Sequence, residues 1–386
     1  MAELSDAGKH FLDIKVGDEI GSGIVTSFLG EGGNAVVYKI RNDKLGVSRA
    51  VKILKPDQNK EAAERFNTEM KILAQLSHPN IVNVHSVGEY KGLSFIEMDL
   101  AEGLSLDTLI SSRGSIPFLV SLAIIIEIGN ALHYIHNRQY KIDGKSERGL
   151  LHRDVKPANI LLPLMNRVRL TDFGISTLST STVRSFTAQN TLLGSLQYLA
   201  PEELDNKALD VRSDIYAFGC VMYEMLTGNK AFPQATIEEL ISARVKNKFP
   251  PIKTRGKKIP IEIVNLVKRC MSDNPQKRPE NALEIVTLVE NFYKKHTSAL
   301  PEETISSYIG GLDVSQSAAL KNVKNKKKPP DSSELTRALA TSVLIVFFGF
   351  VAWIAVKKIN PEFADFAARK LQNQVEIKVE LKNFEE

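Results

Sequence analysis

Two short stretches of the sequence contain the residue types that transfer of a phosphoryl group requires. The first is "HRDVKPAN" at 152–159, and the second is "DFG" at 172–174, which begins thirteen residues after Asn159. A carboxylate such as Asp154 can orient an attacking hydroxyl group and accept its proton. Asn159 and Asp172 offer the hard oxygen ligands that Mg²⁺ prefers. The pattern therefore predicts phosphoryl transfer assisted by a divalent cation.

A glycine-rich stretch near the N-terminus could bind the phosphates of a nucleotide. It reads "GEGGNAVVYK" from Gly30 to Lys39 and lies between two strand-like runs. Gly30 and Gly32 lack a Cβ atom and would let backbone N–H groups approach a polyphosphate. Ala35 takes the place of a third glycine, which is a modest steric change, and Val37 would offer an apolar surface to a base. We interpret the stretch as a working nucleotide clamp rather than a simple turn.

Two lysines could supply positive charge to the same phosphates. Lys52 ends the strand-like run that contains Ala50, and Glu69 lies in the helix-patterned segment 61–76. A lysine at a strand end is most often a solvated edge residue unless an acidic partner is present. A Lys52–Glu69 pair would direct the ammonium group toward the α- and β-phosphates, while Lys156 would face the γ-phosphate.

The surrounding elements suggest two sub-domains with a cleft between them. Strand-like runs dominate from residue 25 to about residue 100, interrupted by the helix-patterned segment 61–76. From about residue 105 to 295 the apolar residues recur with a helical period, as in "FLVSLAIIIEIGNALHYIH". Strands followed by helices are typical of the α+β class.

The ordered motifs resemble those of eukaryotic-type protein Ser/Thr kinases. "APE" at 200–202 follows the glycine-rich loop, the strand lysine, the helix glutamate and the two stretches described first, over roughly residues 24–295. The resemblance implies a two-lobed α+β kinase fold, with an N-lobe at 24–100 and a C-lobe at 101–295. It also implies ATP with Mg²⁺, or with Mn²⁺ in its place, and protein substrates.

The resemblance implies roles for further residues. Asp214 would brace the backbone of the catalytic loop, Arg278 would pair with Glu202, and Leu73 would join an apolar stack. Met98 would be the gatekeeper before a hinge at Asp99 to Ala101 that binds adenine through its backbone. The stack would also include His152 and Phe173. Phe173 and Gly174 belong to the stretch "DFG", which would form the magnesium loop.

Substrate class and regulation are also implied. Lys156, two residues after the catalytic aspartate, is the form found in Ser/Thr kinases, and Ser195 resembles the residue that hydrogen-bonds the catalytic aspartate and lysine. Arg153 resembles the arginine that pairs with a phosphate in the activation segment. Thr187 and Thr191 lie nearest to the usual autophosphorylation sites. The alternative is that Ser and Thr merely suit a mobile loop.

One departure from the family is an insertion before the catalytic loop. The stretch "NRQYKIDGKSERG" at 137–149 stands where the family usually has only a few residues. We expect a surface loop that leaves the catalytic loop intact.

The C-terminal region predicts a membrane anchor. Residues 338–356, "ALATSVLIVFFGFVAWIAV", carry no charge over nineteen residues, about 28 Å as a helix and close to the hydrocarbon thickness of a bilayer. The alternative is a buried core helix. Six Lys/Arg within twenty residues before the span and four after it favour a cytoplasmic kinase and an external tail at 357–386. A polar lead-in at 1–23 and a flexible basic linker at 296–337 complete the predicted organisation.

Composition limits the possible partners. The net charge is +5 over 386 residues, so we expect no nucleic-acid partner. Cys220 and Cys270 lie in apolar helical stretches and are expected to be reduced core residues. The external tail is a candidate for homodimerisation. Two other functions remain open: a membrane-tethered pseudokinase, disfavoured by the complete catalytic set, and a small-molecule kinase, disfavoured by the activation segment and "APE".

Overall fold

The structure is a computed structural model. It describes residues 14–31, 35–55, 70–142, 145–163, 167–173, 196–204, 209–234, 236–252 and 259–312. The chain divides into two units, 1–317 and 318–386, and every described residue belongs to the first unit. Several predicted features lie outside the described residues: Gly32, Glu69, Gly174, Thr187, Thr191, Ser195, the span 338–356 and the tail 357–386.

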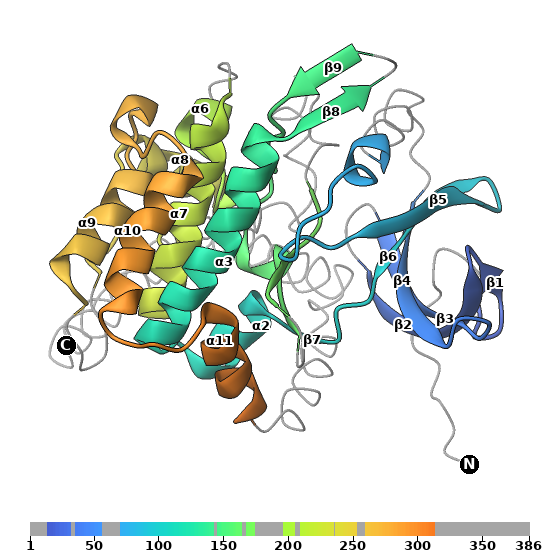
Figure 1. Ribbon diagram of the computed structural model, residues 1–386. Helices are drawn as coiled ribbons and strands as arrows, with labels where there is room; N and C mark the ends of the chain where they lie inside the picture. Colours follow the sequence, from blue (N-terminus) through green and yellow to red (C-terminus); the bar gives the residue numbers. More distant parts are fainter. Residues whose placement is uncertain are drawn as a thin grey trace, which may run out of the picture. The chain divides into compact units, whose positions relative to one another are not determined.

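The N-lobe is an antiparallel sheet of six strands in the order β1-β2-β3-β4-β6-β5 (Figure 1, blue to cyan). The strands are β1 (Glu19–Ile20), β2 (Gly23–Glu31), β3 (Ala35–Asn42), β4 (Val47–Leu54), β5 (Val84–Tyr90) and β6 (Leu93–Asp99). Alternate residues such as Ile40, Val51 and Ile53 are fully buried on one face. Because side chains alternate along a strand, the other face is free to line a binding site.

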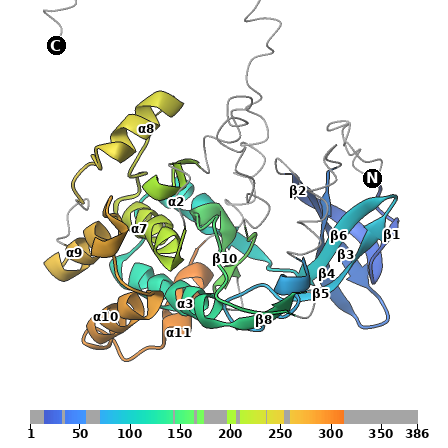
Figure 2. The same cartoon turned by 90° about the horizontal axis from the view of Figure 1, so that it is seen from above.

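The C-lobe is helical. Its helices are α2 (Leu106–Arg113), α3 (Phe118–Asn137), α6 (Pro201–Leu204), α7 (Val211–Thr227), α8 (Ile237–Val245), α9 (Ile261–Cys270), α10 (Ala282–Lys294) and α11 (Pro301–Gly310). Helix α3 lies against α7, α10 and α11 (Figures 1 and 2). A Cβ atom on Gly129 of α3 would lie 2.6 Å from Val286 of α10, so glycine permits this close packing. The two lobes predicted from the sequence, one rich in strands and one helical, are confirmed.

Helix α3 is apolar around most of its circumference because it is the core of the C-lobe. Among the described residues it alone is long and apolar enough to cross a membrane, but 72% of its most apolar window is buried. Cys220 and Cys270 are likewise buried and free, as expected. Burial raises the pKa of each thiol to about 12, which keeps both in the unreactive thiol form.

A small sheet and a short helical turn flank the catalytic segment. Strands β7 (Gly103–Ser105), β10 (Ile160–Pro163) and β11 (Arg169–Leu170) pair in the order β11-β10-β7. The turn η1 (Pro157–Asn159) leads directly into β10, and η4 (Pro275–Lys277) precedes α10. Asp154 and Asn159 therefore lie before β10, and Asp172 lies just after β11, next to two strands whose register is fixed by their pairing.

Two features differ from the sequence prediction. The insertion at 137–149, expected as a surface loop, contains a hairpin of β8 (Gln139–Ile142) and β9 (Lys145–Arg148). The prediction of a flexible linker from residue 296 is wrong for residues 301–310, which form α11 with Ile305 and Ile309 buried. Pro301 at the first helical position and these two apolar residues, spaced by one turn, give that segment a helical preference and a face to bury.

Candidate active site

Asp214 holds the backbone of the catalytic loop. It lies in the first turn of α7 and is 2% exposed. Its carboxylate accepts hydrogen bonds from the backbone N–H groups of His152 and Arg153, each at 2.8 Å, and one from His136 Nε2 at 2.8 Å. Burial alone would raise the pKa of Asp214, but these donors hold it below its ordinary value. Arg153 has φ 64°, a left-handed conformation that the buried carboxylate stabilises.

Asp154, Lys156 and Asn159 form one hydrogen-bonded group. Lys156 Nζ lies 2.7 Å from Asp154 Oδ2, and Asn159 Nδ2 donates to the same oxygen at 2.9 Å. Asn159 Nδ2 also faces the backbone oxygens of Asp154 and Asp172, at 2.8 and 3.3 Å. The amide therefore ties the catalytic loop to the magnesium loop and fixes the orientation of the Asp154 carboxylate.

Asp172 lies beside Lys52. Lys52 Nζ is 2.6 Å from Asp172 Oδ1, and Asp172 has φ 57°. Burial raises the pKa of Asp172, but the charge and the hydrogen bond of Lys52 outweigh it and hold the pKa below the ordinary value. The expected partner of Lys52, Glu69, lies outside the described residues.

Asn159 and Asp172 fit a magnesium ion. The amide nitrogen of Asn159 is used on three oxygens, which leaves its side-chain oxygen as the ligating atom, and Asp172 is ionised. The described residues contain no group of three or more His, Cys, Asp or Glu side chains placed to hold a metal. Two protein oxygens suit Mg²⁺, which usually completes its octahedron with water and substrate phosphates.

The face predicted to bind the nucleotide can be described from strand register. Val37 pairs with Lys52 across β3 and β4, and Lys52 and Ala50 pair with Ile96 and Met98 across β4 and β6. Paired residues, and residues two apart on one strand, share a face. The sheet therefore presents Lys52 beside apolar side chains.

Gly30 and the hinge flank this face. Gly30 pairs with Val37 next to an irregularity in β2, and open space surrounds the position of a Cβ atom. The side chain of Asp99 bonds to Asn83 Nδ2 at 3.0 Å, to His85 Nε2 at 2.6 Å and to Arg169. Ala101 follows in the connection to β7. Arg169 on β11 thus ties the hinge to the strand that precedes Asp172, a contact that no sequence motif indicated.

An apolar stack lies between the lobes. The rings of His152 and Phe173 are 4.4 Å apart and tilted by 31°. Leu73, Phe173 and Lys52 line one cavity, which is completed by Val82, Val84, Ile96, Met98, Leu170, Thr171 and Asp172. The structure thus brings together the three members of the stack implied by the resemblance, beside the predicted gatekeeper.

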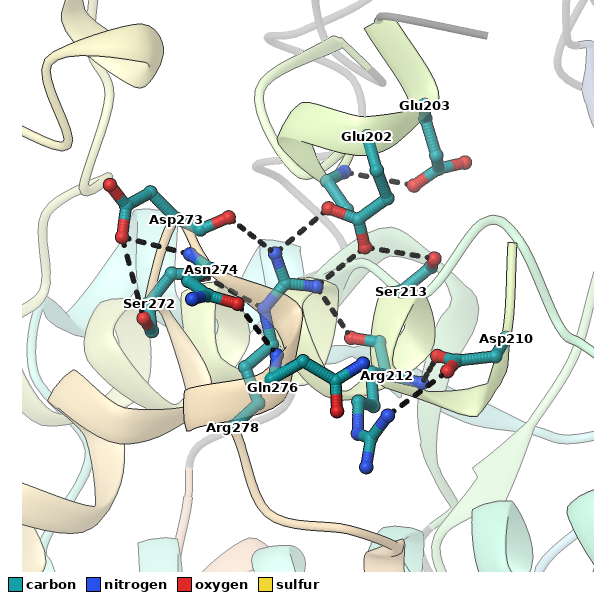
Figure 3. A network of polar contacts seen from close by, with 11 residues as sticks. Glu202, Glu203, Asp210, Arg212, Ser213, Ser272, Asp273, Asn274, Gln276 and Arg278 are labelled. Carbon is teal, nitrogen blue, oxygen red and sulfur yellow. Dashed lines mark hydrogen bonds and ion pairs between the residues drawn. The ribbon is translucent and has the colours of Figure 1, made fainter. Parts of the chain in front are cut away.

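Glu202 and Arg278 form a buried ion pair in the C-lobe (Figure 3). Two guanidinium nitrogens of Arg278 donate to the two oxygens of Glu202 at 2.6 and 2.8 Å, and Ser213 Oγ donates at 3.0 Å. Arg278 also donates to the backbone oxygens of Arg212 and Ser272. Burial raises the pKa of Glu202, but the hydrogen bonds and charge of Arg278 hold it below the ordinary value.

The pKa of Glu203, the neighbour of Glu202, is shifted in the opposite direction. Its Oε1 accepts a hydrogen bond from the N–H of Ala200 at 2.8 Å. Burial, with smaller contributions from the negative charges of Asp214 and Glu202, raises its pKa to about 7. Sequence reasoning missed Glu203, His136 and Arg169, because their roles depend on neighbours that lie far away in the chain.

The sequence matches the protein kinase domain family over residues 24–290. The chain belongs to this family. It is 36% identical over 281 residues to a probable serine/threonine-protein kinase of Clostridium perfringens, covering 72% of this chain and 38% of that relative. It is 32% identical over 256 residues to the serine/threonine-protein kinase PrkC of Bacillus subtilis, covering 66% and 38%.

Solved structures give the same fold. A point mutant of the kinase domain of Mycobacterium tuberculosis PknI aligns with a TM-score of 0.55 at 24% identity, over 74% of this chain and 100% of that domain. The match to the curated relatives spans about two fifths of their length.

Proposed function

We propose that this chain is a membrane-anchored protein Ser/Thr kinase that transfers the γ-phosphate of ATP to hydroxyl groups of proteins. The observation that carries the proposal is the group of Asp154, Lys156 and Asn159, joined by hydrogen bonds of 2.7 and 2.9 Å next to the Lys52–Asp172 pair. Such an arrangement would offer a base, two cation ligands and two positive charges around one space.

Each of these residues would have a separate role in the transfer. The substrate oxygen would form a bond to the γ-phosphorus while the bond to the bridging oxygen of ADP breaks, and Asp154 would orient the hydroxyl and take its proton. Lys156 would offset charge on the transferred group, and Lys52 would hold the α- and β-phosphates. Asn159 and Asp172 would hold Mg²⁺, which supplies charge neutralisation on the phosphates when bound. Val37, Ala50 and Met98 would cover the adenine.

Specificity and control are proposed from the sequence. Lys156 and Ser195 support Ser/Thr substrates, as do the relatives named as serine/threonine-protein kinases. Thr187 and Thr191 are proposed autophosphorylation sites, and Arg153 is the residue that would bind the phosphate. Glu69 is proposed as the ion-pair partner of Lys52.

The membrane arrangement is proposed from residues 338–356. A span there would keep the kinase in the cytoplasm, where ATP is present, and would leave 357–386 outside as a tail that could mediate homodimerisation. The lysines at 321–328 could contact anionic lipid. The pseudokinase alternative has no observation in its favour, because Lys52, Asp154, Asn159 and Asp172 are all present.

The test is phosphate incorporation by the full chain purified in mild detergent with Mg-ATP, beside Asp154→Asn. We expect phosphoserine or phosphothreonine on the unmutated chain and on a generic protein substrate, with both signals lost in the variant. Mapping should find Thr187 or Thr191 modified. Nucleotide binding without any incorporation would refute the kinase proposal and support a binding scaffold. Protease accessibility of the tail in sealed vesicles tests the topology.

A further inference from the structure

The β8–β9 hairpin lies in the insertion at 137–149, and it contacts both lobes. We propose that this hairpin is a positioning element for the helix predicted to carry Glu69, and that Gln75 is the residue through which it acts. The proposal rests on the kinase function proposed above, because it concerns the rate of that reaction. Figure 1 shows the hairpin extending beyond the end of α3 toward the N-lobe.

Gln75 binds the hairpin through both ends of its side-chain amide. Its Oε1 accepts a hydrogen bond from the backbone N–H of Lys141 at 2.9 Å, and its Nε2 donates to the backbone oxygen of Lys141 at 3.0 Å. The same nitrogen donates to the backbone oxygen of Lys71 at 2.7 Å. Lys71 belongs to the helical residues 70–73, so the Gln75 amide links that helix to the hairpin.

The contact uses a specific edge of the hairpin. Lys141 pairs with Ser146 across β8 and β9. In an antiparallel pair, a residue that directs its N–H and C=O away from its partner strand exposes both groups on the outer edge. The side-chain amide of Gln75 pairs with the N–H and C=O groups of Lys141, as the backbone of a neighbouring strand would. The geometry therefore depends on the backbone of the hairpin, which explains why no side-chain motif reveals it.

The base of the hairpin is fixed to the C-lobe. Gly149 N–H donates to the oxygen of Arg138 at 3.1 Å, and Leu150 N–H donates to the oxygen of Ile135 at 2.9 Å. Tyr140 packs against the C-lobe core. His152 of the catalytic loop follows Gly149 by three residues. The hairpin can therefore hold Gln75 at a fixed distance from the catalytic loop.

The helix that Gln75 holds carries active-site residues. Leu73 lines the cavity that also contains Lys52 and Phe173. Glu69, the proposed partner of Lys52, precedes Gln75 by six residues, which is less than two helical turns. In kinases the Lys–Glu pair must be in place for transfer. Loss of the hairpin contact should thus lower the fraction of molecules with this pair formed.

A second hydrogen bond to the C-lobe lies close to Gln75. Ser77 N–H donates to the hydroxyl oxygen of Tyr134 on α3 at 3.1 Å. This bond lies after the helical residues and fixes the following connection, whereas Gln75 binds back to Lys71 inside the helix. We therefore expect loss of Gln75 to shift the helix without unfolding the lobe.

The test is a double-mutant cycle on the full chain in detergent. Gln75→Ala removes the amide, and a shortened hairpin replaces Lys141 to Ser146 by Asn-Gly, a two-residue turn that still closes Tyr140 onto Glu147. Lys145→Ala, an exposed change on β9, is the matched control. Rates are measured at saturating Mg-ATP and peptide, with KM values and melting temperatures.

We expect kcat to fall about three- to tenfold in Gln75→Ala with little change in KM for the peptide, the signature of a lost positioning effect. The shortened hairpin should show the same loss, and the combined variant should lose no more than either single change. Lys145→Ala should keep the unmutated rate. If the shortened hairpin does not fold, Gln75→Glu, which keeps the acceptor but loses the donor, should reproduce the loss.

Two outcomes would overturn the proposal. One is a Gln75→Ala rate within twofold of the unmutated chain, and the other is a combined loss equal to the product of the separate losses. These outcomes differ from failure of the kinase proposal, in which the unmutated chain itself would be no more active than Asp154→Asn.

Discussion

Two ion pairs of the same length have different surroundings in this protein. Lys52–Asp172 in the cleft and Arg278–Glu202 in the C-lobe each have a closest N–O distance of 2.6 Å. The side chains of the first pair are 24% and 41% exposed, whereas those of the second are 0% and 8% exposed. Water can reach both side chains of the first pair, whereas burial excludes water from both side chains of the second.

The surrounding contacts follow the same division. Arg278 has its remaining N–H groups bound to backbone oxygens and its guanidinium 4.8 Å from the Tyr216 ring. Asp172 instead keeps a left-handed backbone conformation beside a cavity. Distance alone therefore does not tell a structural pair from a functional one. Burial and satisfaction of the remaining donors make the distinction.

The largest effect is expected from the cleft pair, on activity. Asp172→Asn removes a cation ligand and the charge opposite Lys52, so kcat should fall about a thousandfold or more, about 4 kcal/mol of barrier. The melting temperature should change little, because exposed pairs contribute about 0–1 kcal/mol. Steady-state kinetics and thermal unfolding of the same preparation check both parts. A large loss of stability would show that this pair also supports the fold.

The next largest effect is expected from the buried pair, on stability. Arg278→Ala leaves Glu202 without its charge partner in the C-lobe, which should lower the free energy of unfolding by about 3–5 kcal/mol. Urea unfolding followed by far-ultraviolet circular dichroism measures it. The matched control is Arg269→Ala, because the Arg269–Glu284 pair has the same 2.6 Å distance with side chains 46% and 40% exposed. That change should cost at most about 1 kcal/mol, and equal losses in the two variants would contradict the comparison.

The smallest effect is expected from Glu203 and depends on pH. Its pKa in the folded chain is about 7, above the reference 4.5, so the folded state binds more protons than the unfolded state between these values. Stability should fall as pH rises from 4.5 to 7, by at most about 3 kcal/mol. Glu203→Gln keeps an acceptor for Ala200 N–H and should remove this slope. Unfolding at pH 5, 6, 7 and 8 gives the comparison, and an unchanged slope in the variant would count against the raised pKa.

The order and spacing of the motifs were enough to predict the chemistry and the fold class. "HRDVKPAN", "DFG" and "APE" could be identified because each is a short, continuous stretch, although Asp214 holds the backbone of the first and Arg278 pairs with Glu202 of the last. The strands and helices followed from apolar periods that local sequence carries. Met98 was assigned to the same site as Ala50 and Lys52 from the resemblance to protein kinases, and the strand pairing in the structure places all three on one face.

Contacts between residues that are far apart in the sequence could be identified only from the tertiary structure. His136 meets Asp214 from 78 positions away, and Gln75 meets Lys141 from 66 positions away. The linker prediction failed at α11 because a short amphipathic segment forms a stable helix only when its apolar side packs against another element, here α3. The pKa of Glu203 likewise depends on burial by distant elements. Local sequence determines which structures a segment can form, and the packing of the whole lobe determines which groups lose their water and which find a partner.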